Sequence, residues 1–413
     1  MGLLKTSVLN GVAVGTKMGT GLVLNKILAV YVGPAGYAVI GQLQNVISIT
    51  TTFASGAINT GVTKYTAEYH DQPAKLRSLW KTAGTFTVGG AFFIGLIIAI
   101  FRNYISDQFL NNIEYSKALV WLAACLLFIS LNSLLLAILA GQKSVKRYVA
   151  ASIAGSLISL ITSGFLAWKY GLSGVLAALS LGQGISFGAT VLLCRKLEWC
   201  TIGGLAGRVN WEMARKLGHY VLMAIATATA VPVTQILIRG HIQEVYSASY
   251  AGYWDAINKI STIYLTLATT TLSLYYLPRV AEIRKKHELR NEIWACFRIV
   301  VPVIAIASCS IFVLRSQLVG LLFTPEFLPM TGLMGWQMLG DVFKIASWLF
   351  AYVVIGKART AVFVSTEIFF SVSLYFLTVV LMDKMGPSGF TAAYAANYVL
   401  YFLTMYWLVM VKQ

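Results

Sequence analysis

The sequence predicts an all-α polytopic membrane protein with twelve transmembrane helices. Of its 413 residues, 58% are hydrophobic and only 11% are charged, and its mean hydropathy is +0.73. A soluble domain carries about 25% charged residues, so this composition is typical of a membrane protein. A spanning helix needs about 20 mainly apolar residues. Gly- and Pro-containing turns separate the predicted spans, which are residues 6–32, 36–62, 78–101, 115–140, 148–168, 172–194, 214–239, 249–278, 292–314, 331–356, 360–382 and 387–411.

The basic residues predict the orientation of these spans. An even number of spans places both termini on one side of the membrane. With cytoplasmic termini, most Lys and Arg residues fall in inner segments, as the positive-inside rule requires. The outer segments hold Arg102, Lys117, Lys169, Arg239, Arg315 and Lys384. The net charge of +17 therefore follows from topogenic residues, and we expect no nucleic acid partner.

An internal repeat divides the chain into two halves. Gly171 and Gly386 open similar segments 215 residues apart, and Gly141 and Gly356 end two spans at the same offset. Residues 35–37 and 251–253 both read Ala-Gly-Tyr. We therefore predict two six-helix bundles, residues 1–200 and 201–413, related by a pseudo-twofold axis along the membrane normal. Transporters built in this way bind their substrate near the midplane and alternate its access.

Four lysines lie inside the predicted spans: Lys17, Lys26, Lys259 and Lys344. A charge at the bilayer centre costs at least about 2.5–3.5 kcal/mol, so such residues mark functional positions by default. The long side chain of Lys26 could instead reach the outer interface. Three glycines on its N-terminal side make a helix bend plausible, which would bring Lys17 and Lys26 to one side.

Three acidic residues accompany these lysines. Asp255 precedes Lys259 by four residues and Asp341 precedes Lys344 by three, so each pair either neutralises itself or serves a substrate. Glu367 has no partner in its own helix; it pairs with a lysine of another helix or couples transport to protons. Four lysines against three acids predict a cationic interior and therefore a substrate with an anionic group.

The uncharged polar residues and the missing motifs narrow the function further. Gln42, Gln44 and Asn45 of the second span either hydrogen-bond sugar hydroxyls or hold helices together. The sequence has no P-loop, G-x-S-x-G or H-E-x-x-H motif. Its four histidines are dispersed, and its five cysteines form no C-x-x-C pair. We expect no enzymatic activity, no metal and no cofactor.

Several segments together resemble a known family. They are residues 33–36 (Gly-Pro-Ala-Gly), residues 61–65 (Gly-Val-Thr-Lys-Tyr), residues 336–344, and Lys17 with Lys26. The chain resembles, over its whole length, the Wzx polysaccharide-repeat flippases of the multidrug/oligosaccharidyl-lipid/polysaccharide exporter superfamily, and especially their O-antigen and lipid III members.

This resemblance implies a V-shaped cavity between two bundles and a substrate of undecaprenyl pyrophosphate bearing an oligosaccharide repeat unit. It implies transfer from the cytoplasmic to the periplasmic leaflet of the bacterial inner membrane. Candidate partners are a polysaccharide polymerase and a chain-length regulator, besides membrane lipids. The positions that match the family are Lys17, Lys26, Lys64, Asp341, Lys344 and Glu367. Asp255 and Lys259 match no motif of the family, so they are predicted as site residues only because a charge inside the membrane is costly.

Three other functions remain open. A drug or lipid exporter could share the architecture, although an exporter of cationic drugs needs an acidic interior. A polysaccharide polymerase or ligase needs a sizeable outer domain, whereas the longest predicted outer loops are residues 102–115 and 315–331. A structural scaffold would not need lysines at mid-depth.

Overall fold

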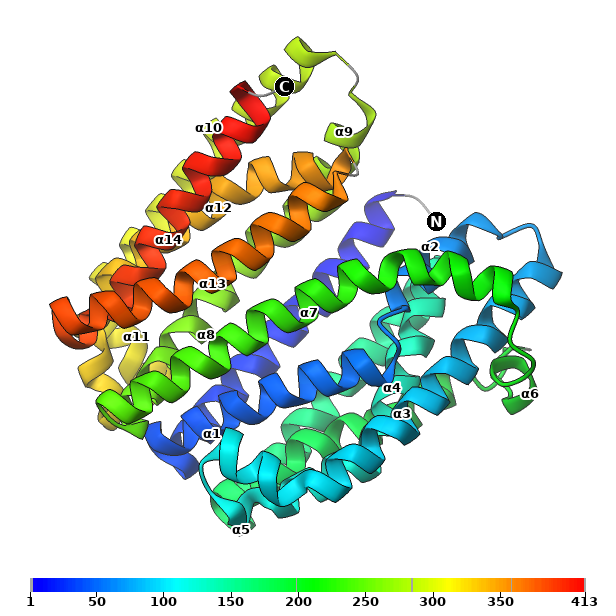
Figure 1. Ribbon diagram of the computed structural model, residues 1–413, viewed down its shortest axis with the longest axis horizontal. Helices are drawn as coiled ribbons and strands as arrows, with labels where there is room; N and C mark the ends of the chain where they lie inside the picture. The colour runs from blue at the N-terminus through cyan, green and yellow to red at the C-terminus, as the bar shows by residue number, and fades with distance from the viewer. Residues whose placement is uncertain (1–2, 198, 284, 358, 412–413) are drawn as a thin grey trace. The chain divides into compact units, whose positions relative to one another are not determined.

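The computed structural model describes residues 3–197, 199–283, 285–357 and 359–411, and these residues form helices and turns without a strand. The chain divides into two compact units: Met1–Val32 with Val39–Pro232, and Gly33–Ala38 with Val233–Gln413. The division falls inside the helix α7 (Trp211–Val245). Figure 1 shows the course of the chain by colour.

The first unit is built mainly from long helices. They are α1 (Leu3–Ala54), α2 (Asn59–Glu68), α3 (Pro73–Leu110), α4 (Ser116–Gly141), α5 (Val145–Cys194) and the short α6 (Ile202–Leu205). The helix α4 packs against both α3 and α5, and α2 packs against α4. Apolar side chains such as Leu79, Leu134 and Ile138 form a buried cluster between these helices, which supplies most of their cohesion.

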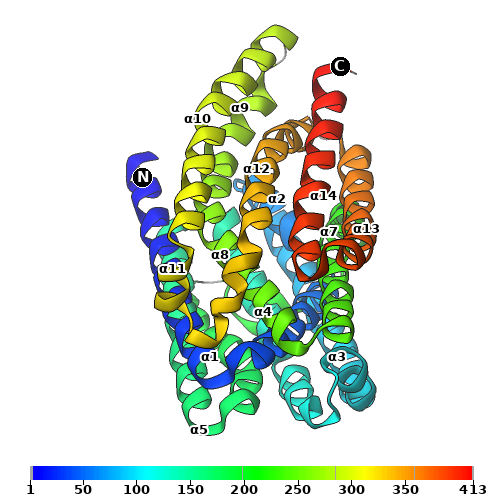
Figure 2. The ribbon, with the colours of Figure 1, turned by 90° about the vertical axis from the view of Figure 1, so that its left-hand side faces the viewer.

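The second unit has a comparable set. It comprises α8 (Ala248–Thr271), α9 (Leu277–Glu282), α10 (Lys286–Val313), α11 (Arg315–Leu322), α12 (Met334–Gly356), α13 (Thr360–Met385) and α14 (Gly389–Tyr406). The helix α12 packs against α10 and α14, and α13 packs against α14. Figure 2 shows α10, α12 and α14 in a view turned by 90° from that of Figure 1. Their core is rich in aromatic rings, including Phe350, Phe370 and Tyr401.

Within the part of the chain that the structure describes, seven helical runs are long and apolar enough to cross a membrane, so the protein is a multi-pass membrane protein. Three of them, Val14–Ala54, Val145–Cys194 and Thr360–Val411, have 41, 50 and 52 residues, although about 20 suffice for one span. Each contains a glycine with positive φ: Gly33 at 65°, Gly171 at 57° and Gly386 at 64°. The left-handed conformation breaks each run into two helical segments, and glycine adopts it without steric cost.

The repeat is visible in the packing as well as in the sequence. Gly171 and Gly386 share similar backbone angles, with ψ of −138° and −148°. A Cβ on Gly174 would meet the carbonyl oxygen of Leu166, and a Cβ on Gly389 would meet that of Leu381. Both glycines and both contact residues are 215 positions apart. The same turn and the same close approach therefore occur in each half.

Two local expectations were wrong. The backbone of α1 is helical through Gly15, Gly19 and Gly21 and departs from helical angles only at Gly33, so these three glycines do not break the helix between Lys17 and Lys26. The second predicted span, residues 36–62, is interrupted: α1 ends at Ala54 and α2 begins at Asn59. Gly56 and Ala57 between them both have positive φ, 64° and 53°.

Candidate functional site

Among the predicted site residues of the second unit, Asp341 is the most completely buried. Asp341 lies on α12 and is 0% exposed. Its Oδ2 accepts hydrogen bonds from Ser261 Oγ at 2.6 Å and from the Tyr264 hydroxyl at 2.7 Å, both on α8. Its Oδ1 accepts a third from the Tyr394 hydroxyl of α14 at 2.7 Å. Three such bonds replace much of the hydration that a buried carboxylate loses.

A second set of polar groups supports these donors. Gln337 Nε2 donates to Asn258 Oδ1 at 3.2 Å and to Ser261 Oγ at 3.3 Å. The Tyr264 hydroxyl lies 2.9 Å from Ser308 Oγ on α10. Because the Tyr264 proton points to the carboxylate, Ser308 is the donor in that pair. The network therefore connects four helices, α8, α10, α12 and α14.

Lys344 lies one turn beyond Asp341 on α12 and is partly buried. Its Nζ is 5.2 Å from the ring centroid of Tyr398, 5.6 Å from that of Tyr394 and 5.5 Å from that of Trp348. Aromatic faces at these distances attract a cation. Asp341 and Glu367 of α13 interact with it electrostatically. The ammonium group thus lies among rings, while the Asp341 carboxylate is occupied by hydroxyl groups.

Asp255 has a different partner from the one its sequence spacing suggests. Both of its oxygens accept hydrogen bonds from Arg239 of α7, at 2.7 Å from Nε and 2.7 Å from a terminal nitrogen. The Arg239 side chain is 2% exposed and that of Asp255 is 11% exposed. The guanidinium also lies 5.5 Å from the ring of Trp254. The sequence analysis gave Asp255 only Lys259 as a partner; the structure adds a bidentate pair with Arg239, which was expected at an outer helix end, while Lys259 also interacts with Asp255 electrostatically.

The remaining predicted lysines are distributed over both units. Lys17, Lys26 and Lys64 belong to the first unit. Lys17 and Lys64 are exposed and Lys26 is partly buried, and Lys64 Nζ lies 5.2 Å from the ring of Tyr65. Lys259 of α8 is partly buried. Of the predicted set, the structure brings together Asp341, Lys344 and Glu367.

The sequence reading missed the hydroxyl donors of this network. Single Ser and Tyr residues are common in membrane helices, so Ser261, Tyr264 and Ser308 carried no signal. Tyr394 and Tyr398 could have been found, because two tyrosines four residues apart share a helix face. In the described part of the chain, no group of three or more His, Cys, Asp or Glu side chains could hold a metal ion.

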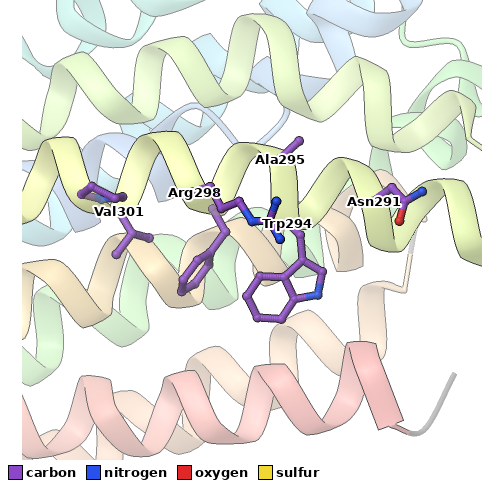
Figure 3. Close-up of a pocket in the computed structure, with 7 residues that line it drawn as sticks. Asn291, Trp294, Ala295, Arg298 and Val301 are labelled. Atoms are coloured by element: carbon purple, nitrogen blue, oxygen red, sulfur yellow. The ribbon is translucent and has the colours of Figure 1, made fainter.

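A separate hollow of about 740 Å³ lies along α10, lined by Asn291, Trp294, Ala295, Phe297, Arg298, Val301 and Pro302. Figure 3 shows the side chains of Trp294 and Arg298 near one another on this helix. None of the predicted site residues lines this hollow.

Comparison with known proteins gives the relatives of this chain. The lipid III flippases of Escherichia coli (strain K12) and Shigella flexneri are each 29% identical to it over 405 residues, 97% of either length. Among solved structures, an inward-facing multidrug resistance MATE family transporter of the MOP superfamily matches with a TM-score of 0.78 at 14% identity, covering 95% of this chain and 94% of that one. The lipid II flippase MurJ, in an inward closed conformation, matches with a TM-score of 0.75 at 12% identity, covering 98% and 87%.

These structural likenesses establish the fold alone, which this chain shares with these two transporters. Residues 27–332 match the family described as "Polysaccharide biosynthesis protein". Because the match covers most of the sequence, the chain belongs to the polysaccharide biosynthesis protein family.

Proposed function

We propose that this protein is a flippase for undecaprenyl-pyrophosphate-linked oligosaccharide repeat units. It moves them from the cytoplasmic to the periplasmic leaflet of the bacterial inner membrane by alternating access. In this proposal the chain crosses the membrane twelve times, both termini are cytoplasmic, and residues 1–200 and 201–413 form the two six-helix halves. It performs no chemical step on its cargo.

The observation that carries this proposal is the likeness to the lipid III flippases, 29% identity over 97% of both lengths. A match over 97% of both lengths covers nearly the whole chain rather than one shared motif. The likeness to a multidrug transporter has 14% identity and supports only a common fold. The positively biased set of intramembrane charges also favours an anionic headgroup over a cationic drug.

The chemistry of the site agrees with a pyrophosphate. Lysine is a compact point charge that binds phosphate oxygens. An ammonium group such as that of Lys344, placed among rings rather than against a carboxylate, can bind an incoming anion. An inside-negative potential drives an anion outward by about 2.3 kcal/mol per charge per 100 mV. Two charges would thus supply about 5 kcal/mol at 100 mV without ATP.

We propose the following roles for the predicted residues. Lys17 and Lys344 contact the pyrophosphate, Glu367 couples transport to an ion or proton, and Asp341 holds the α8 and α14 hydroxyls around the site. The lysines at positions 26, 64 and 259 remain proposed contacts along the headgroup's path. Asp255 is engaged by Arg239, so we assign it to the framework.

The test is complementation of a strain that lacks the gene. Loss of the protein should leave lipid-linked repeat units on the cytoplasmic leaflet. Lys17→Ala and Lys344→Ala should lower surface polysaccharide at normal protein level, because each removes a phosphate contact. Lys169→Ala is the matched control, since Lys169 is also a lysine beside a tyrosine ring, at 5.2 Å from Tyr170, but lies in a predicted outer segment. Normal polymer with both site variants would end the assignment.

A further inference from the structure

The first unit contains a pocket of about 390 Å³ whose lining is polar and uncharged. It is formed by the end of α1, the start of α2, and one residue each from α4 and α5. The lining residues are Gln44, Ile47, Ser48, Thr51, Thr52, Ser55, Asn59, Ser133 and Gln183. Eight of these nine carry a hydroxyl or an amide, and none carries a charge. The volume lies within the range of about 300–1,000 Å³ that small-molecule sites occupy.

The helix is interrupted at this pocket. Ser55 lines it immediately after α1 ends, and Asn59 lines it at the first residue of α2. Ala57 between them has φ of 53°, a left-handed conformation that costs an L-residue about 1–2 kcal/mol. Its backbone nitrogen donates to Thr52 O at 2.9 Å. Irregular backbone at membrane depth is tolerated where it is buried in protein or lines a hydrated cavity, and broken helices form the substrate sites of many transporters.

Several oxygen atoms of the lining have lone pairs that no protein group uses. Thr51 Oγ1 and Asn59 Oδ1 are buried with no hydrogen-bond partner among the described residues, a state that costs about 1–3 kcal/mol for each group. The hydroxyls of Thr52, Ser55 and Ser133 donate to helix carbonyls and keep lone pairs that can accept. A ligand with many hydroxyls would satisfy the accessible lone pairs, and a side-chain rotation of Thr51 or Asn59 toward the pocket would bring their two buried oxygens within its reach.

The repeat relates this pocket to the charged site of the second unit. Ser133 and Gln183 lie 215 positions before Trp348 and Tyr398, the two rings that lie beside the Lys344 ammonium. The same place in the duplicated fold therefore carries aromatic rings around a lysine in one copy and hydroxyl and amide groups in the other.

We propose that the pocket at the α1–α2 break is a sugar subsite, which binds an uncharged hexose or N-acetylhexosamine of the transported headgroup. This inference rests on the proposed flippase function. A phosphate would require cations, which the described lining lacks, and an acyl or prenyl chain would offer no hydrogen bonds to Thr51 Oγ1, Asn59 Oδ1 or the free lone pairs of the lining hydroxyls. A bare cation would fill little of the space, since a water molecule takes about 30 Å³.

The experiment measures binding to the purified full-length protein in detergent. The probes are a short-chain polyprenyl pyrophosphate without sugar and a panel of the same lipid bearing one hexose or N-acetylhexosamine. The wild type should bind at least one sugar-bearing lipid more tightly than the sugar-free lipid. Thr51→Val and Asn59→Ala should each reduce that gain by about 2- to 10-fold, the effect of one lost hydrogen bond. Both variants should bind the sugar-free lipid as the wild type does.

Three further variants show whether a change in sugar binding comes from the pocket itself. Thr87→Val removes another buried hydroxyl without a partner that does not line the pocket, and it should leave the gain intact. Ser48→Ala changes an exposed lining residue without disturbing packing, so it should lower the gain even if positions 51 and 59 do not tolerate change. Lys344→Ala should weaken binding of all probes alike.

Three outcomes overturn the inference. If the wild type binds every member of the panel no better than the sugar-free lipid, the subsite is absent while the flippase proposal stands. If Ser48→Ala and the two buried variants keep the full gain, the sugar binds elsewhere. If the wild type binds neither kind of lipid, the proposed function fails and the subsite fails with it.

Discussion

Removal of the Asp255 carboxylate should destabilise the second unit strongly. Asp255 of α8 and Arg239 of α7 form two parallel hydrogen bonds of 2.7 Å each. Both side chains are nearly enclosed, at 11% and 2% exposure. Replacement of Asp255 by Asn keeps the size of the side chain but removes its charge and one acceptor. The guanidinium then remains buried without the carboxylate that stabilises it.

The burial of both side chains determines how strongly Asp255→Asn destabilises the protein. Breaking a buried ion pair costs about 3–5 kcal/mol, because the remaining charge keeps its desolvation penalty. An exposed pair contributes at most about 1 kcal/mol. The chain offers such a pair as an internal comparison: Lys285 and Glu288 are 3.1 Å apart at 80% and 54% exposure. For a domain of this size, about 2–4 °C of Tm corresponds to 1 kcal/mol, so the expected shift for Asp255→Asn is about 6–20 °C.

The assay is thermal unfolding of the detergent-purified protein, followed by tryptophan fluorescence. Asp255→Asn should unfold well below the wild type, and Glu288→Ala should stay within about 2–4 °C of it. The double variant Arg239→Met with Asp255→Leu should recover most of the loss, since apolar replacement of both partners is often neutral. A double variant as unstable as the single one, or a single variant as stable as the wild type, would refute the reasoning.

Three further predictions concern the backbone turns and the carboxylate network. Ala57→Gly should raise the free energy of unfolding by about 1 kcal/mol, because glycine adopts the left-handed conformation freely; denaturation in detergent measures it. Gly174→Ala and Gly389→Ala should each lower Tm, since the added Cβ meets a backbone carbonyl, whereas Gly188→Ala has open space and should not. Tyr394→Phe removes one of the three hydroxyls that bind the buried carboxylate of α12 and should cost about 1.5–3 kcal/mol, measured by the same unfolding assay.

The sequence predicted the helices better than their interruptions. Apolar length alone located most of the helical segments, and the Gly171 and Gly386 turns were visible as repeated motifs. The break between Ala54 and Asn59 was not predicted, because Gly56 is an isolated glycine and Ala57 has no preference for positive φ. Only tertiary packing of the surrounding helices can hold an alanine there.

The charged residues were found from sequence because a charge in an apolar span stands out. Their partners were found less well. The i, i+4 spacing favoured Lys259 as the partner of Asp255, whereas Arg239 comes from a neighbouring helix. A local pattern contains no information about contacts between helices, so it could not identify this pair. Ser261 and Tyr264, two of the three hydroxyl donors to Asp341, escaped detection for the same reason.

The two halves of the repeat have kept their helices and have changed their chemistry. At the offset of 215 residues, Asp341 and Lys344 correspond to Leu126 and Ile129 of α4, which are 0% and 3% exposed and belong to the apolar interior. Ionised groups at those two positions would lack the hydroxyl and aromatic partners that the second unit supplies. A lipid-linked sugar phosphate presents two kinds of group, an anion that needs cations and a sugar that needs uncharged donors and acceptors. In the proposed function, duplication followed by divergence would provide one environment for each, because each copy can adapt its interior without the other's charges.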